Sequence, residues 1–576
     1  MHRVAIALFS ISLATAQVQI LPQITVANGA SLVQTGTAAP GSMLRIDLFP
    51  LPDESATNSV TIGVTILPNG ARFAMECGIL PQTAQFLFPN QVTAVLPSSL
   101  PLGPAQLTLY YNGVSVSKQI LIVESSLGLF APGAQYPVQQ MGSDGELLTN
   151  QLTHPAKPGD TVTLWATGLG TATQATVLLG GRATTSAAAG PVKGMPGVDQ
   201  IQFVVPDDAT IPNDCYVALA VETPDLTSNT ITISKTSDGS VCQSTLGLSA
   251  EDLAMLDAGG TVGLAQLTLS AQVGAPVLSV RTGDFLLGVP TVGLPVPSSR
   301  GFARAELADF RPQMVNASLV AQISGTVVAD EAFFGCTAAS AGGLAISGVF
   351  AFPSPYDFGK AVTLQGAGGT LSLTAPLGPF YEGQQTSPTV PDPGALAMPL
   401  FTAGDWTFSG QGGTGGQGVV ATSPFSVPLA LPTEIMATNF TALQTINRQQ
   451  DLTVMWNPSG FGAGDVLTVT LGGYAGPLYF SLSGFAPISQ WFYVAPGEAA
   501  VWCNMPASSG QVVIPAAMVG RLTPGKPGGP PNATVSLSVN QRPGHRQTFS
   551  LPLSDGTSLP VVLQFSSSET WPVTVQ

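Results

Sequence analysis

The segments KPGD at residues 157–160 and DQIQFVVP at residues 199–206 decide how this chain folds, because they form the second copy of a pattern. The first copy reads APGS at residues 39–42 and NQVTAVLP at residues 90–97. The Pro-Gly pair recurs after 118 residues and the Gln recurs after 109 residues. A repeat of this length indicates a duplicated domain, since solenoid repeats span roughly 20 to 50 residues.

Both copies contain short segments in which apolar and polar residues alternate. Leu44, Ile46 and Leu48 are separated by polar residues, and the same period of two recurs over residues 60–66. This period indicates β-strands with one buried face. The pair NG at residues 112–113 separates two such segments and predicts a hairpin turn. About seven short strands in roughly 100 residues predict an immunoglobulin-like β-sandwich.

Glycine and proline are frequent in this chain, and charged residues are rare. The 576 residues include 64 Gly and 49 Pro, and only 9% are charged. Strands joined by many tight turns use Gly and Pro in this way. The 44% hydrophobic content excludes a disordered chain. A net charge of −15 without a basic patch argues against nucleic acid or an anionic lipid surface as a partner.

The first 16 residues have the features of a secretory signal peptide. A positive Arg3 precedes an apolar stretch over residues 4–13, and ATA at residues 14–16 fits the A-x-A cleavage rule. Cleavage between Ala16 and Gln17 would release a protein that is secreted or displayed at the cell surface. The alternative is that this stretch is a buried first strand. No later segment reaches about 18 apolar residues, so we expect no transmembrane helix.

We expect a signal peptide and four β-rich regions. These are residues 1–16 (signal peptide), 17–124 (first module), 125–236 (second module), 246–432 (β-rich domain) and 433–576 (C-terminal β-sandwich domain). The sequence further predicts a short helix over 250–256, a strand over 319–328 and a hairpin over 364–373. The expected fold class is therefore all-β, with tandem immunoglobulin-like sandwiches followed by further β-sandwich domains.

Several short motifs resemble a known module. They are TLWATGLG at 163–170, LGGRA at 179–183, the QI…P segment at 200–206, SN at 228–229, NGAS at 28–31 and GLF at 128–130. In this order they resemble an uncharacterised module of acidobacterial secreted proteins, of the Solibacter type, which is related to the IPT/TIG immunoglobulin-like sandwiches. The resemblance covers about residues 25–235. That family has no established activity, so the resemblance implies no catalytic residues.

Five cysteines leave at least one thiol that is free or pairs between chains. Cys215 and Cys242 are the most plausible disulfide, because they bracket the last part of the second module. Cys336 and Cys503 are a weaker candidate, because they fall in different expected domains. Alternatively, all five are buried small side chains. No C-x-x-C spacing occurs, which argues against zinc or redox chemistry.

The sequence offers few residues for catalysis. Beyond the signal peptide the histidines are His154 and His545, both in turn-like surroundings, and no G-x-S-x-G elbow accompanies them. Neighbouring carboxylates at 207–208, 251–252 and 330–331 would point to opposite faces of a strand, although a paired-carboxylate glycoside hydrolase remains an alternative. The segment GQGGTGG at 410–416 lacks the Lys of a phosphate-binding loop and predicts a flexible turn. We expect no catalytic residue, cofactor or metal.

Five of the six tryptophans follow residue 400, namely Trp406, Trp456, Trp491, Trp502 and Trp571. Exposed in a row they would stack on sugar rings, but burial in the core is the favoured interpretation. Trp491 is the best candidate for an exposed ligand contact. We therefore predict a non-catalytic exported protein for adhesion, envelope scaffolding or ligand display, with a cell-surface protein or polysaccharide as partner. The alternative is a carbohydrate-binding or carbohydrate-processing protein that acts through its C-terminal half.

Overall fold

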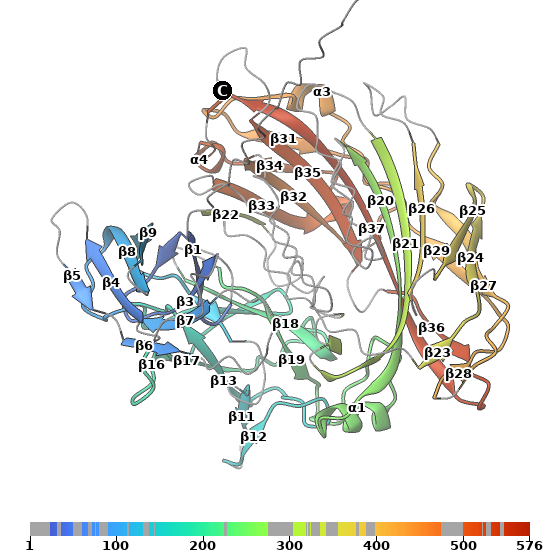
Figure 1. Cartoon of the computed structure of the whole chain (residues 1–576), viewed down its shortest axis with the longest axis horizontal. Helices are drawn as coiled ribbons and strands as arrows, with labels where there is room; N and C mark the ends of the chain where they lie inside the picture. The colour runs from blue at the N-terminus through green and yellow to red at the C-terminus, as the bar shows by residue number, and fades with distance from the viewer. Residues whose placement is uncertain are drawn as a thin grey trace, which may run out of the picture.

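The structure is a computed structural model of the whole chain (Figure 1). It describes residues 23–31, 36–49, 60–66, 72–74, 76–79, 90–111, 114–130, 137–142, 145–223, 227–274, 303–317, 319–320, 323, 335–340, 355–375, 380–387, 398–416, 418–462, 464–473, 499–520, 522, 524–525, 532–541 and 546–576. Strands dominate these ranges, which confirms the expected all-β class.

The first module is a sandwich of two sheets. Its strands are β1 (Gln23–Asn28), β2 (Thr37–Ala38), β3 (Met43–Phe49), β4 (Val60–Ile66), β5 (Arg72–Ala74), β6 (Glu76–Ile79), β7 (Asn90–Val95), β8 (Gly103–Tyr111) and β9 (Val114–Ile122). One sheet has the order β1-β3-β7-β6 and the other β2-β9-β8-β4-β5. Apolar side chains from both sheets, such as Ile46 and Leu107, form one core between them. Tyr111 pairs with Val114 in the expected hairpin, whose two turn residues lie outside the described residues.

The second module is also a two-sheet sandwich. Its strands are β10 (Gly128–Leu129), β11 (Gln139–Met141), β12 (Leu147–Thr149), β13 (Thr161–Thr167), β14 (Thr176–Leu179), β15 (Arg182–Thr185), β16 (Ala188–Pro191), β17 (Asp199–Val204), β18 (Asp214–Glu222) and β19 (Ile231–Lys235). One sheet has the order β12-β11-β13-β17-β16, with β10 beside β13, and the other β15-β14-β18-β19. Leu164 and Phe203 from the first sheet meet Val177 and Leu219 from the second in the core.

The repeated sequence motifs occupy equivalent places in the two modules. In the first, β3 pairs with β7 so that Met43 lies opposite Val95. In the second, β13 pairs with β17 so that Thr161 lies opposite Val204. These two pairs differ by the same 118 and 109 residues that separate the motif copies. The two modules therefore share the same strand pairing and the same register, as the spacing of the motifs indicates.

The remaining strands form one large sheet with small additions. They are β20 (Val262–Gly274), β21 (Ala303–Val315), β22 (Gly335–Ser340), β23 (Tyr356–Asp357), β24 (Ala361–Gly366), β25 (Gly369–Thr374), β26 (Tyr381–Thr386), β27 (Gly404–Gly410), β28 (Val420–Ala421), β29 (Phe425–Leu431), β30 (Thr445–Ile446), β31 (Leu452–Met455), β32 (Asp465–Gly473), β33 (Ala499–Pro506), β34 (Gln511–Ile514), β35 (Ala533–Gln541), β36 (Thr548–Pro552) and β37 (Ser558–Val575). The main path is β22-β33-β32-β35-β37-β20-β21-β26-β25-β24-β27-β29. β24 and β25 confirm the hairpin expected over 364–373.

Strands from both expected C-terminal regions share this sheet and two hydrophobic cores. β20 runs parallel to β37, with Leu269 opposite Phe565. The first half of β37 packs into one core with β20, β24 and β27. Its second half, with Trp571, packs into another core with β32 and β35. Regions 246–432 and 433–576 therefore share one sheet, because β37, the last strand of the chain, lies beside β20, the first strand of region 246–432.

The few helices are short. α1 (Ala250–Asp257) confirms the predicted helix, and a capping box with Ser249 and Asp252 explains where it begins. α3 (Phe440–Leu443) and α4 (Ala516–Val519) span four residues each. The strand predicted over 319–328 is wrong in its described part, because Leu319, Val320 and Ile323 are helical. The Asn316 side chain accepts a hydrogen bond from the Leu319 N–H at 2.9 Å, as a helix N-cap does.

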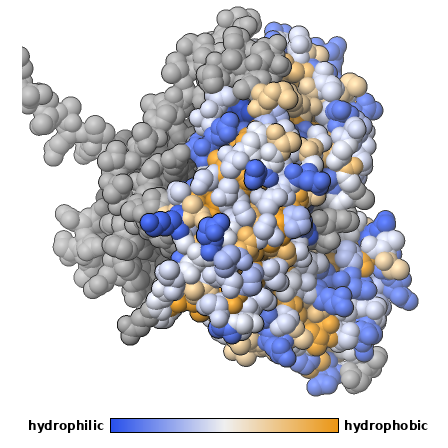
Figure 2. Space-filling model, turned by 90° about the vertical axis from the view of Figure 1, so that its right-hand side faces the viewer, coloured by the Kyte–Doolittle hydropathy of each residue, from blue (hydrophilic) through white to orange (hydrophobic). Residues whose placement is uncertain are grey.

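The outer surface of the large sheet mixes polar and apolar residues. Along β27, Trp406 and Phe408 face the core while Thr407 and Ser409 face outward. Figure 2 accordingly shows hydrophobic and hydrophilic residues interleaved on the face that it views. Trp406, Trp456 and Trp571 are 0–3% exposed, which confirms the core interpretation for these three. The side chain of Trp502 lies outside the described residues.

Candidate functional site

The structure leaves several sequence-predicted site residues undescribed. Trp491, His545 and the cleavage residues Ala16 and Gln17 all lie outside the described residues. His154 is exposed, and its Nδ1 lies 3.1 Å from the Thr153 hydroxyl, as expected of a surface turn. In the described ranges, no three His, Cys, Asp or Glu side chains are grouped to hold a metal ion. None of the helices in these ranges is long and apolar enough for a bilayer span.

The glycine-rich segment 410–416 wraps around the carboxylate of Asp357, a residue of the same chain. The backbone N–H groups of Thr414 and Gly415 donate to Asp357 Oδ2 at 2.9 and 3.0 Å. Gly359 donates to Asp357 Oδ1 at 2.8 Å, and these bonds hold the pKa of Asp357 below its ordinary value. The amides that a phosphate would need are therefore already occupied by a side chain of the fold.

The described neighbouring carboxylates serve local structure. Asp208 accepts from the backbone and hydroxyl of Thr210 at 2.8 and 2.6 Å. Asp252 accepts from Ser249 in the capping box of α1. Residues 330–331 lie outside the described part of the chain. Asp208 and Asp252 therefore bond to local partners, which is not the arrangement that a general acid and base would need.

A buried polar belt, defined by Arg304, Glu306, Glu434, Ser567 and Glu569, separates the two cores of the large sheet. Arg304 forms an ion pair with Glu434. Glu306 is 2% exposed and accepts the backbone N–H groups of residues 400 and 401 at 2.6 and 3.0 Å. Sequence reasoning missed this belt, because its carboxylates come together only across strands and loops.

Glu569 shows how strongly burial affects the belt. It is 1% exposed, and its Oε2 accepts the Ala437 N–H at 2.6 Å while Oε1 has no hydrogen-bond partner. Burial raises the pKa of Glu569 to about 7, against the effect of that bond. Ser567, two residues earlier on β37, accepts the Ile435 N–H at 2.8 Å. These carboxylates are buried, as in a structural belt, so a sugar chain has no access to them for hydrolysis.

The two modules meet through residues of the motifs that carry the family resemblance. Asn28 Nδ2 donates to the Ser126 carbonyl at 2.9 Å, and the Met43 N–H donates to Thr167 Oγ1 at 2.7 Å. A Cβ on Gly170 would lie 1.8 Å from the Glu124 carbonyl oxygen. The turn at Gly170 therefore needs glycine, because the backbones of the two modules touch there.

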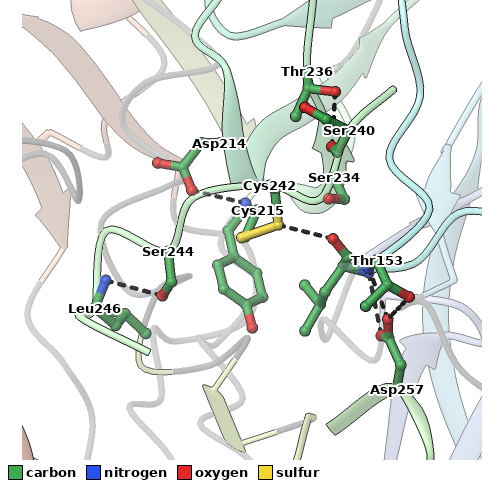
Figure 3. Close-up of a disulfide and its surroundings, with 12 residues drawn as sticks. Thr153, Asp214, Cys215, Ser234, Thr236, Ser240, Cys242, Ser244, Leu246 and Asp257 are labelled. Atoms are coloured by element: carbon green, nitrogen blue, oxygen red, sulfur yellow. Dashed lines mark hydrogen bonds between the residues drawn. A yellow bond between two sulfur atoms is a disulfide. The ribbon is translucent and has the colours of Figure 1, made fainter. Parts of the chain in front are cut away.

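At a second junction, the second module packs on the large sheet around a disulfide (Figure 3). Cys215, on β18, bonds to Cys242, which follows β19, with the Cα atoms 5.1 Å apart. The Cys242 N–H donates to the Leu152 carbonyl at 3.3 Å, and Cys242 Sγ lies 3.1 Å from the same oxygen. Apolar residues from both sides, including Tyr216 and Val562, pack around the disulfide as one core.

Helix α1 is tied to this junction by Asp257. Its Oδ2 accepts the backbone N–H and hydroxyl of Thr153 at 2.8 and 2.7 Å, as Figure 3 shows. Nearby, Asp214 accepts the Tyr216 N–H at 3.1 Å, and burial raises the pKa of Asp214 to about 6. Polar and apolar contacts beside the disulfide therefore fix the second module on the large sheet.

Cys336 and Cys503 form a second disulfide, with the Cα atoms 4.0 Å apart. They are cross-strand neighbours, because β22 pairs with β33 at the edge of the large sheet. The weaker candidate pair is thus bonded, since residues 335–340 join the sheet of the C-terminal region. The side chain of Cys77 lies outside the described residues.

The second module presents an uncharged face, the outer side of the sheet containing β13. Its side chains occur in registered rows, such as Thr149, Gln139, Thr163 and Gln202. In this row Thr149 is exposed, Gln139 and Gln202 are partly buried, and Thr163 is buried. A neighbouring row contains Leu147, Met141, Thr161 and Val204. The opposite side of β13, with Leu164, faces the core. Amide, hydroxyl and apolar side chains without a charge make this face our candidate binding surface.

No protein-family model and no curated protein matches the chain. Among solved structures it is similar to bovine butyrophilin, with 7% identity, a TM-score of 0.12, and coverage of 36% of this chain and 98% of that one. The D1–D4 ectodomain fragment of ICAM-5 has 11% identity, a TM-score of 0.11, and coverage of 97% and 100%. Dpr2 Ig1–Ig2 in complex with DIP-Theta Ig1–Ig3 has 8% identity, a TM-score of 0.12, and coverage of 72% and 99%. Scores this low carry no argument, so the sandwich assignment rests on the strands and cores described above.

Proposed function

We propose that this chain is an exported, non-catalytic protein for adhesion, envelope scaffolding or ligand display. The observation that carries the proposal is the double mounting of the second module. Asn28 and Gly170 hold it on one side, and Asp257 and the core around the Cys215–Cys242 disulfide hold it on the other. Rigid mounting presents a binding face in a fixed orientation, which lowers the entropy lost on binding. Two disulfides support an oxidising location outside the cytoplasm.

We also keep the IPT/TIG-like assignment and the domain boundaries as proposals. The equivalent register of β3–β7 and β13–β17 supports modules at residues 17–124 and 125–236. Signal-peptide cleavage between Ala16 and Gln17 is tested by the intact mass of the mature protein. A mature chain that retains residues 1–16 would contradict export through this segment.

The test of function uses the mature chain on washed envelopes of the cells that produce it. Gln202→Lys places a charge on the uncharged face, and we expect at least tenfold weaker binding. Gln119→Lys makes the same change on an exposed residue of β9 and serves as the matched control. Equal binding by both variants, or no binding by the unmodified chain, would contradict the proposal.

Polysaccharide binding is a second candidate function, which the uncharged amide and hydroxyl rows favour. Three of the five late tryptophans are buried, so they offer no aromatic platform for sugar rings. Trp491 remains a proposed contact. Neutral plant and bacterial glucans serve as probes, with Gln202→Lys and Trp491→Ala as separate variants. Loss of glucan binding only in Trp491→Ala would assign the site to the C-terminal half. Loss of glucan binding only in Gln202→Lys would assign it to the second module.

A further inference from the structure

Strand β12 is a short sheet edge that no charged residue or proline protects. It pairs only with β11 and ends its sheet. Leu147 is 58% exposed and Leu148 is 37% exposed. Because consecutive residues of a strand point to opposite faces, β12 shows an apolar side chain on each face. Natural edge strands are blunted by charged residues, proline, bulges or very short length. Of these β12 has only its length of three residues, because neither β11 nor β12 contains a charge or a proline and their register has no shift.

The exposed apolar surface continues inward from this edge. Leu147 lies opposite Met141, Met141 opposite Thr161, and Thr161 opposite Val204. Met141 is 42% exposed and Val204 is 45% exposed. Directly opposed side chains on one face are about 5 Å apart and form a continuous row. Apolar surface of this kind marks a site of protein contact more often than chance exposure.

We propose that a second copy of this chain adds its own β12 to this edge, antiparallel and related by a two-fold axis through Leu148. The two six-stranded sheets then become one sheet across the interface. Each Leu147 lies opposite Thr149 of the second copy, and the apolar rows of the two copies lie on the same face. Strand addition of this kind supplies main-chain hydrogen bonds to an otherwise open edge.

The flanking charges favour a second copy in this register. Outside the paired residues, Glu146 falls opposite Asn150 of the second copy, so the two Glu146 side chains do not face each other. The chain carries a net charge of −15, so contact between two copies needs a surface without acidic residues. Strand β12 provides such a surface. An interface centred on one residue is also self-complementary, as two-fold symmetry requires.

The first experiment is a cross-linking test on the full mature chain. Leu148→Cys places a thiol opposite its own copy at the two-fold axis, where an antiparallel pair brings Cα atoms within about 5 Å. We expect this variant to form a disulfide-linked dimer under mild oxidation. Met255→Cys, at an exposed residue of α1, and the unmodified chain are the controls for unspecific oxidation. A Leu148→Cys chain that stays monomeric like its controls would contradict the proposal.

The second experiment measures mass by sedimentation between about 1 and 100 µM, a range that spans weak to moderate dimers. We expect the mass of two chains for the unmodified protein and at least tenfold weaker association for Leu148→Lys. Met255→Lys should associate like the unmodified protein. A monomer throughout, or a dimer that Leu148→Lys does not weaken, would overturn this interface. Either result leaves the envelope-binding proposal intact, because that proposal is tested at Gln202.

Discussion

Asp257 accepts two hydrogen bonds from Thr153, although 104 residues separate them in the sequence. The same carboxylate accepts the Leu152 N–H at 3.2 Å. Asp257 ends α1, and Thr153 follows the β11–β12 hairpin of the second module. One side chain therefore satisfies three donors that belong to the neighbouring module, and it does so beside the Cys215–Cys242 disulfide (Figure 3).

Replacing Asp257 should loosen this junction without removing the disulfide. A hydrogen bond to a charged group contributes about 1.5–3 kcal/mol, and water replaces part of this where the group is partly exposed, as Asp257 is. We therefore expect loss of its three bonds in Asp257→Ala to destabilise the fold by at least about 2 kcal/mol. The measurement is hydrogen exchange at the Leu152 and Thr153 amides, which should become faster. Asp555→Ala removes a carboxylate that bonds only to nearby Thr557 and is the matched control. Unchanged exchange at residues 152–153 would contradict the assigned role.

Glycine at position 170 should be essential for the contact between the two modules. Its φ is +67°, and a Cβ there would lie 1.8 Å from a backbone oxygen. Gly159 has a φ of +89° with nothing within 4 Å of a Cβ, so Gly159→Ala measures backbone strain alone, about 1–2 kcal/mol. We expect Gly170→Ala to lower the melting temperature clearly more than Gly159→Ala. Equal effects would show that the close contact is unimportant.

The sequence motifs predicted the two modules well, because the residues that form each strand pair also carry the repeat. The Pro-Gly turns and the Gln-containing strands recur at fixed spacing, and their pairing follows the same register. The short helix was also predictable, since Ser249 and Asp252 form a local capping box. The alternating pattern that begins at Leu319 predicts a strand, but the N-cap at Asn316 starts a helix there instead.

The sheet of the C-terminal half was not predictable from local patterns. β20 and β37 are parallel neighbours, yet Leu269 and its partner Phe565 lie 296 residues apart in the sequence. Another long-range pairing, between β22 and β33, brings Cys336 to Cys503. Long-range pairing also assembles the buried belt, since Arg304, Glu434 and Glu569 come from three distant segments. Local periodicity predicts that a strand forms, but it does not predict which strand lies beside it.

Loss of the Cys215–Cys242 disulfide should weaken the second junction. The bond closes a loop with a sequence separation of 27 residues. Loop-closure entropy for this length gives a stabilisation of about 3–4 kcal/mol. We expect the Cys215→Ser, Cys242→Ser double variant to unfold at lower denaturant concentration and to be cleaved faster by protease within residues 236–249. Replacing Cys336 and Cys503 instead is the matched control, because it should leave cleavage in that segment unchanged. Equal cleavage in both double variants would contradict a specific role at the junction.

Stability should fall as the pH rises from about 5 to 8. Burial raises the pKa of Glu569 from 4.5 to about 7, so between these two pH values the folded chain holds a proton that the unfolded chain releases. Unfolding is then favoured by higher pH, and the free energy of unfolding falls by about 3 kcal/mol in total once the pH exceeds 7.

Glu569→Gln keeps an acceptor for the Ala437 N–H and removes the titration. This variant should therefore be more stable than the unmodified chain at pH 8, and its stability should depend less on pH. Glu251→Gln, at an exposed residue of α1, is the control. Some slope should remain in Glu569→Gln, because burial also raises the pKa values of Asp199 and Asp214 to about 6. Melting temperatures of the three proteins at pH 5 and pH 8 test this, and a Glu569→Gln slope equal to that of the unmodified chain would contradict it.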